Sequence, residues 1–176
     1  MRTIVQMLTG ALVVVVAIMV IGIVYVRSTG LRGQPEPGTL EARVAQAIRG
    51  FAIPRASKAR SNPVEPSKEN LVKGMEHFAR YCAMCHANDG SGKKTPIGSG
   101  LYPKPPDLNS EGQHLTDGEL FYIIENGVRF TGMPAFGTGQ EDPAGTKQVW
   151  QLVHFIRHLP EITKEEIEHM ESLNPL

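Results

Sequence analysis

Cysteine is scarce in this sequence, and so are the patterns that usually identify a nucleotide-binding or a β-sheet protein. Only two of the 176 residues are cysteine, which is too few for a disulfide scaffold. No glycine-rich phosphate loop and no internal repeat is visible. No stretch alternates apolar and polar residues for long enough to predict a strand. The periodic pattern that remains is helical, so we expect an all-α protein.

The sequence also lacks a net charge, because 18 Lys and Arg balance 18 Asp and Glu. The charges are nevertheless unevenly spread. Residues 1–66 hold eight basic and three acidic residues, whereas residues 67–176 hold ten basic and fifteen acidic residues. An acidic folded part repels phosphate, so we expect no nucleic-acid partner.

The first long feature of the chain is an uncharged apolar run from Ile4 to Val26. As a helix it would be about 35 Å long, enough to cross a hydrocarbon core of about 30 Å. A cleaved signal peptide has a shorter apolar region and is followed by a small-x-small cleavage site. The run here is longer, and no convincing cleavage site follows it. We therefore interpret residues 1–27 as a single transmembrane anchor. The flanking charges, Arg2 on one side and Arg27 and Arg32 on the other, do not decide its orientation.

Residues 28–66 are interpreted as a linker that contains one short amphipathic helix. The stretches 28–39 and 52–67 are rich in proline and small or basic residues and have no hydrophobic period. Between them, apolar residues recur at helical spacing from Leu40 to Phe51. This helix either lies on an anionic membrane surface or packs on a neighbouring protein. A linker of this length would let the folded part swing while keeping it near the membrane.

Residues 67–160 are predicted to form the folded domain, from three helices and long loops. The first helix follows an N-cap at Ser67, and the second begins with a capping box of Thr116 and Glu119 and ends at Gly127. The third helix is expected over residues 145–159, stopped by Pro160. Loops of this length need something to pack on, and a cofactor would supply it. Residues 161–176 read as an acidic, solvated tail with a short capped helix.

The two cysteines stand in the pattern Cys-x-x-Cys-His, formed by Cys82, Cys85 and His86. This is the haem attachment pattern, in which each thiol adds to one vinyl group and the histidine is directed at the iron. A structural zinc site needs four ligands and the chain has no further cysteine, so zinc is the weaker alternative. A thioredoxin-like dithiol is also weaker, because no βαβ pattern surrounds the motif.

A haem needs a second axial ligand or an open site, and Met133 is the candidate for the second ligand. It stands between a glycine and a proline in a downstream loop, and a methionine on iron raises the reduction potential. Its rivals fit less well: Met75 belongs to the first helix, Met84 lies inside the motif and Met170 lies in the tail. His114, in a loop of uncertain position, is the remaining alternative.

Residues 69–160 resemble a class I, mono-haem cytochrome c of the membrane-anchored bacterial type. Gly74 and Phe78 precede Cys82 at the family spacing, and the segment "HANDGSG" is similar to the turn after the family's haem motif. The segments "DGELFYIIENGV", "GMPAF" and "LVHF" resemble the family's middle helix, methionine loop and terminal helix. The resemblance implies the cytochrome c fold around one haem c, bound covalently through both cysteines.

The resemblance also implies a function, an electron-transfer protein rather than an enzyme. His86 and Met133 would ligate the iron, and the chain would pass single electrons between redox partners. The alternative is a fixed subunit of a larger respiratory or photosynthetic complex. Because haem attachment takes place outside the bacterial cytoplasmic membrane, we expect the amino terminus inside and the haem domain on the periplasmic side.

Two details of the haem pocket follow from the same resemblance. In the family a proline carbonyl accepts a hydrogen bond from the axial histidine. The candidates here are Pro96, Pro103, Pro105 and Pro106, of which Pro103 or Pro105 is favoured. Arg129 would either pair with a haem propionate or stand exposed beside its loop.

Overall fold

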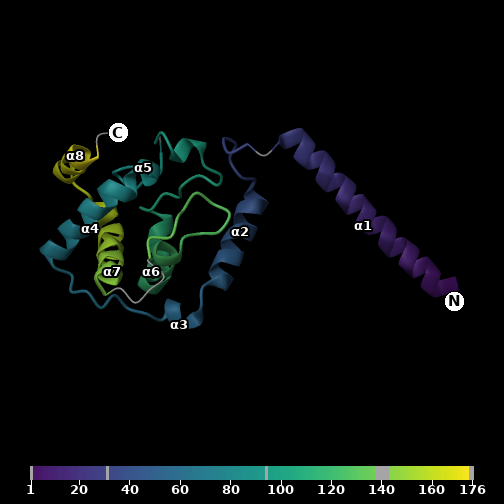
Figure 1. Cartoon of the computed structure of the whole chain (residues 1–176), viewed down its shortest axis with the longest axis horizontal. Coiled ribbons are helices and arrows are strands. Elements are labelled where there is room, and N and C mark those ends of the chain that lie inside the picture. Colours follow the sequence, from purple (N-terminus) through teal and green to yellow (C-terminus); the bar gives the residue numbers. More distant parts are fainter. Residues whose placement is uncertain (1, 31, 94, 138–142, 175–176) are drawn as a thin grey trace. The chain divides into compact units, whose positions relative to one another are not determined.

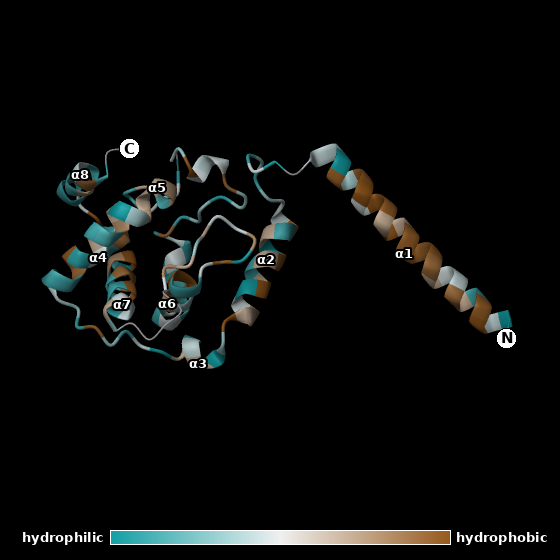
Figure 2. Ribbon diagram, in the orientation of Figure 1, coloured by the Kyte–Doolittle hydropathy of each residue, from teal (hydrophilic) through white to brown (hydrophobic). Residues whose placement is uncertain are grey.

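The computed structural model describes residues 2–30, 32–93, 95–137 and 143–174 and divides the chain into two compact units, Met1–Gly33 and Gln34–Leu176. The first unit consists of helix α1 (Arg2–Thr29), none of whose residues is buried. Its 28 residues are long and apolar enough to cross a membrane, as Figure 2 shows by the hydrophobic colour along most of its length. Length and composition are therefore compatible with a membrane anchor, as they are with a signal sequence.

The second unit is helical, and the described part of the chain contains no strand (Figure 1). The all-α prediction is confirmed. The helices are α2 (Thr39–Ala52), α3 (Arg55–Lys58), α4 (Lys68–Tyr81), α5 (Ala83–His86), α6 (Asp117–Asn126), α7 (Pro143–His158) and α8 (Lys164–Leu173). The described residues also form three 3₁₀ turns, η1 (Gly98–Gly100), η2 (Glu111–His114) and η3 (Leu159–Glu161).

The helix ends follow the capping residues that the sequence predicts. The Ser67 hydroxyl accepts the Asn70 N–H at the start of α4, and complete capping boxes begin α6 at Thr116 and α8 at Thr163. Helix α7 ends at His158, one residue before the expected end, because Pro160 lies in the 3₁₀ turn that follows.

The core of the domain is the contact between α4 and α7 (Figure 1). Gly74 makes the close approach possible, since a Cβ there would stand 2.1 Å from the Gln151 carbonyl oxygen and 3.2 Å from the Phe155 Cβ. One turn along, the rings of Phe78 and Phe155 lie 5.1 Å apart between centroids. The glycine and the aromatic residue that precede Cys82 at the family spacing thus pack against the "LVHF" segment of α7.

The segment after α2 differs from the linker predicted for residues 28–66. Ile53 is only 4% exposed, and the carbonyl of Val64 lies 2.7 Å from Nε2 of His154 on α7. Asn62 donates from Nδ2 to the Trp150 carbonyl at 2.9 Å, and Arg60 lies over the Phe121 ring at 4.3 Å. This stretch packs through isolated side chains, which explains why it has no hydrophobic period.

The acidic tail forms the predicted short capped helix with a solvated face, and it also packs on the domain. Helix α8 packs against α4, and its Met170 is completely buried. Ile162 and Leu173 pack partly against the same core. Glu165, Glu168 and Glu171 are exposed on the outer face of α8, while a few apolar side chains anchor the helix.

Candidate functional site

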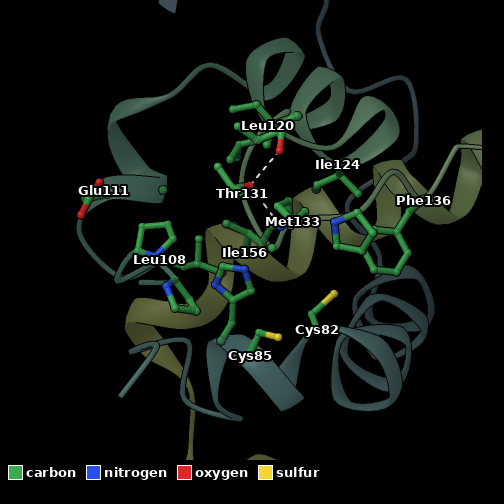
Figure 3. A pocket seen from close by; sticks show the side chains of 18 of the residues that line it. Cys82, Cys85, Leu108, Glu111, Leu120, Ile124, Thr131, Met133, Phe136 and Ile156 are labelled. Carbon is green, nitrogen blue, oxygen red and sulfur yellow. Dashed lines mark hydrogen bonds between the residues drawn. The ribbon is translucent and has the colours of Figure 1, made fainter. Parts of the chain in front are cut away.

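A largely apolar cavity, partly open to solvent, lies among α4, α5, α6, α7 and the loops that connect them. Figure 3 shows Cys82 and Cys85 on one side of it and Thr131 and Met133 on the other. Most of the wall is apolar, with contributions from Phe78, Leu108, Leu120, Ile124, Leu152 and Ile156. The domain therefore closes around a largely apolar space, with sulfur-bearing side chains on two sides of it.

The Cys-x-x-Cys-His motif is held by one turn of helix. Cys82 ends α4 and precedes α5, and its carbonyl accepts the N–H groups of Cys85 at 3.0 Å and His86 at 2.8 Å. This turn brings both thiols and the imidazole into the cavity wall. The two cysteines are not joined in a disulfide.

The environment of the thiols opposes their ionisation. Burial, with a smaller effect of Cys85, raises the pKa of Cys82 to about 12, and burial also raises the pKa of Cys85. A redox nucleophile needs a readily formed thiolate, whereas a bound zinc ion would itself deprotonate its thiol ligands, so the pKa values bear only on the dithiol alternative. Among the described residues, moreover, no group of three or more His, Cys, Asp or Glu is arranged to hold a metal ion. The arrangement disfavours the zinc and dithiol alternatives.

His86 stands at the end of α5 with its ring largely enclosed. Burial lowers the pKa of this histidine, and the carbonyl of Pro106 acts in the opposite direction. Nδ1 is buried and makes no hydrogen bond of ordinary geometry to any described residue. Pro106 is thus the proline whose backbone acts on the imidazole, although Nδ1 forms no hydrogen bond to a described residue.

Of the four candidate prolines, Pro106 and not the favoured Pro103 or Pro105 is the one that acts on His86. The reason lies in the turn after the motif, where Gly92 has φ of +67° and its N–H donates to the His86 carbonyl at 2.8 Å. A Cβ on Gly92 would stand 2.6 Å from the Pro105 carbonyl oxygen and 3.2 Å from that of Pro106. The glycine thus lets the Pro105–Pro106 backbone pass close to the motif.

Thr95 is hydrogen-bonded to the backbone of the motif, a role that the sequence does not predict. Its side chain is 4% exposed, and its hydroxyl donates to the Cys85 carbonyl at 3.1 Å and accepts the Gly98 N–H at 3.0 Å. A single threonine in a loop rich in glycine and proline gives no sequence signal for this role.

Met133 belongs to a loop that is fixed by its own backbone. The Met133 N–H donates to the Thr131 hydroxyl at 3.1 Å, and the Met133 carbonyl accepts the Val128 N–H at 3.1 Å. The Thr131 hydroxyl donates in turn to the Val128 carbonyl at 2.8 Å (Figure 3). The Met133 side chain is half-buried and lines the cavity. Loop geometry thus places a thioether in the wall that faces the cysteines.

The remaining candidates lie elsewhere. His114 is exposed on η2, and Arg129 is exposed beside the loop; neither is among the described residues that line the cavity. The cationic side chains of that wall are Arg49 and Lys104, and Lys104 also donates to the Ser99 carbonyl. Arg49 comes from α2, outside the predicted domain, so no pattern in the sequence links it to the site.

A planar porphyrin with two vinyl groups fits this wall, since the space is large and mainly apolar and the two thiols stand one helical turn apart. A helical domain closed around such a cavity, with Cys-x-x-Cys-His in its wall, is a c-type cytochrome domain.

The comparison with protein families agrees with this class. The family model for the "Cytochrome C oxidase, cbb3-type, subunit III" matches residues 69–156, half of the chain, and the chain belongs to this family. It is an electron-transfer c-type cytochrome with covalently bound haem c.

Two further comparisons add little. No curated protein matches the chain. A chain of the reducing HAO-like protein complex of Kuenenia stuttgartiensis is similar at 20% identity and a TM-score of 0.46. The matched part covers 55% of this chain and 46% of that one, so this chain spans less than half the length of that structure.

Proposed function

We propose that the protein is a membrane-tethered one-electron carrier and not an enzyme, with haem c held by Cys82, Cys85, His86 and Met133. The observation that supports this most directly is the cavity, because the attachment motif and the Met133 loop line its opposite sides. The haem supplies a single iron that alternates between ferric and ferrous states.

Each of the four side chains has a separate task in this proposal. Cys82 and Cys85 would form the two thioether bonds, and His86 would provide the imidazole ligand. The thioether of Met133 favours ferrous iron and so raises the reduction potential. If His86 and Met133 both held the iron, no position would be open to a substrate, which is why a relay is favoured over a catalyst.

The residues around the haem would set the polarity of its surroundings and the charge beside its propionates. The apolar wall excludes water, and low polarity around a haem also favours the less charged ferrous state. Arg49 and Lys104 are the described cations of the wall and would neutralise the propionate groups. Redox partners would dock at the open side of the cavity through a small, transient interface.

The position of the protein follows from α1 and from the chemistry of haem attachment. An uncleaved α1 would span the bacterial cytoplasmic membrane once. The amino terminus would lie inside and the haem domain on the periplasmic side, where haem is attached to such motifs. The electron donor and acceptor would then meet the protein at the outer surface of that membrane.

A fixed subunit of a larger respiratory or photosynthetic complex is the second candidate function. The family description, which refers to an oxidase subunit, favours it. Solubilisation of native membranes in a mild detergent, followed by gel filtration, separates the two candidates. A haem peak at the size of one 19.3 kDa chain in a micelle supports the carrier, whereas co-migration with an oxidase supports the subunit.

The axial ligands are tested by Met133→Ala. The ferric protein should lose the weak far-red absorption band of sulfur-ligated iron, the ferrous protein should bind carbon monoxide, and the midpoint potential should fall. Met84→Ala is the matched control, since Met84 lies between the two cysteines and is 38% exposed. Retention of the far-red band in Met133→Ala would show that another residue ligates the iron.

A further inference from the structure

Helix α2 carries an apolar stripe that nothing in the described structure covers. Its members are spaced by three or four residues and therefore share one face of the helix. Their exposed fractions are large: Leu40 75%, Val44 48%, Ile48 62% and Phe51 92%. A helix of a soluble domain normally turns such a stripe inward.

The opposite, more polar face of α2 is the one that meets the domain. Arg49 lines the cavity, and Gln46 donates from Nε2 to Glu111 Oε2 at 3.5 Å. The Gly50 carbonyl accepts from Lys58 Nζ at 2.6 Å. No residue of α2, all of which the structure describes, is buried. The orientation of the helix is thus the reverse of the usual one, with the apolar side chains directed away from the protein.

The short connection between α1 and α2 indicates that a lipid bilayer covers this stripe. Helix α1 ends at Thr29 and α2 begins at Thr39, so only residues 30–38 connect them. Fully extended, this connection spans at most about 35 Å. Helix α1 is about 42 Å long, more than the hydrocarbon core of about 30 Å, so its end reaches the headgroup region. Helix α2 is therefore held close to the surface of the bilayer that α1 would span.

The charge around α2 fits the same surface. Residues 30–60 contain six Lys or Arg and two Asp or Glu. Arg49, Lys58 and Arg60 contact the domain, which leaves Arg32, Arg43 and Arg55 for the lipid. Basic residues on or beside an amphipathic helix strengthen its binding to anionic lipid headgroups. Arg43 is exposed beside the apolar stripe, as expected for a helix that lies at a lipid surface.

We propose that α2 lies in the interface of the bilayer that α1 spans, with Leu40, Val44, Ile48 and Phe51 in the acyl boundary. This inference rests on the proposed anchoring by α1. The face with Arg49 then lies one helix diameter, about 10 Å, farther from the bilayer than the apolar face. The haem cavity is held near the membrane surface, so electron exchange takes place with partners at that surface rather than with carriers far from it.

Spin labels on the full-length, haem-loaded protein test this placement. A cysteine is introduced by Ile48→Cys, since Cys82 and Cys85 are occupied by the haem. The protein is reconstituted into vesicles of phosphatidylcholine and phosphatidylglycerol. Relaxation by oxygen, which concentrates in lipid, is compared with relaxation by a water-soluble nickel complex. Glu168→Cys, at an exposed position on α8, is the aqueous control.

The label at residue 48 is expected to be relaxed more by oxygen than by the nickel complex. The label at residue 168 is expected to be relaxed more by the nickel complex than by oxygen. Val14→Cys, within α1, reports on the anchor separately. If the label at 14 lies in lipid while the label at 48 lies in water, α2 does not lie in the interface and the proposal is overturned, although the anchoring stands. If the label at 14 lies in water, the anchoring itself fails and this inference fails with it.

A protein partner on α2 would give a different result. In native membranes the label at 48 would then be shielded from both reagents, which would also overturn the proposal. The double variant Val44→Asp, Phe51→Asp provides a second measurement, because both side chains are exposed and the domain should keep its haem spectrum. If the helix lies in lipid, the label at 48 moves into water in this variant; an unchanged label would contradict the proposal.

Discussion

At the scale of single residues, the site depends on a few positions where a side chain would not fit. Gly127 ends α6 with φ of +67°, and the Met133 loop folds back against it. A Cβ there would stand 2.7 Å from the Ala135 nitrogen and 2.8 Å from the Met133 carbonyl oxygen. The capping glycine therefore also sets the position of the proposed iron ligand.

Gly127→Ala should consequently displace the methionine loop. The strained φ alone costs about 1–3 kcal/mol, and the contact with the loop backbone adds to it. We expect a lower thermal midpoint and partial loss of the far-red band of the ferric protein. Gly100→Ala is the control, because no described atom lies within 4 Å of the added Cβ and its φ is not positive. Equal spectra for both variants would mean that the loop does not depend on this glycine.

At the scale of elements, capping residues and periodicity predicted the helices well, because both are local signals. The structure confirms the caps at Ser67, Thr116 and Thr163. What could not be predicted was the packing of residues that have no local pattern. Arg49 reaches the cavity from α2, and Pro106 rather than its neighbours acts on His86, because the chain folds back through non-local contacts.

The contact between α4 and α7 can be tested at Gly74. In Gly74→Ala the new methyl group meets the Gln151 backbone at 2.1 Å, so the helices must separate. Since backbone cannot yield as a side chain can, we expect a loss of about 3 kcal/mol or more in the free energy of unfolding. Gly50→Ala, on α2 with no described atom within 4 Å, should instead stabilise its helix by about 0.5–1 kcal/mol. Thermal midpoints of the haem-loaded proteins measure both, and a similar effect of the two substitutions would contradict the close crossing.

The docking of α3 on α6 should depend on pH through Glu119. Burial opposes its ionisation, but hydrogen bonds from the Thr116 N–H and the Lys58 ammonium, 3.3 Å away, outweigh burial and lower the pKa below the ordinary 4.5. A carboxyl whose pKa is lower in the folded state stabilises the fold above its unfolded pKa. This stabilisation is lost as the pH falls below 4.5 and through the folded pKa.

Glu119→Gln keeps a hydrogen-bond acceptor for the capping box and removes only the charge. We expect it to lower the free energy of unfolding by about 0.5 kcal/mol at neutral pH. The difference from the unmodified protein should shrink toward zero in acid. Glu168→Gln, which removes one carboxylate at an exposed position on α8, is the matched control. Thermal unfolding at several pH values measures it, and a difference that stays constant with pH would exclude the ion pair as its source.

At the scale of the whole molecule, the boundary between the units lies at residues 33 and 34, so the connection is much shorter than the predicted linker. A flexible linker of about 40 residues would have a root-mean-square reach of about 35 Å, whereas the nine residues 30–38 reach about 17 Å. A tethered carrier with this reach serves only partners beside its own anchor. The short connection therefore suits both a carrier restricted to the membrane surface and a fixed subunit.

The connection is this short only if residues 53–66 belong to the folded domain. A substitution at Ile53 tests whether they do. Its side chain is 4% exposed, so Ile53→Ala should leave a cavity and lower the free energy of unfolding by about 2–4 kcal/mol. Ile97→Ala is the matched control, since Ile97 is 46% exposed and its truncation should change the stability by less than about 1 kcal/mol. Both are measured as thermal midpoints of the full-length protein in detergent. If Ile53→Ala unfolds at the same temperature as Ile97→Ala, residues 53–66 act as a free linker, and the longer reach applies.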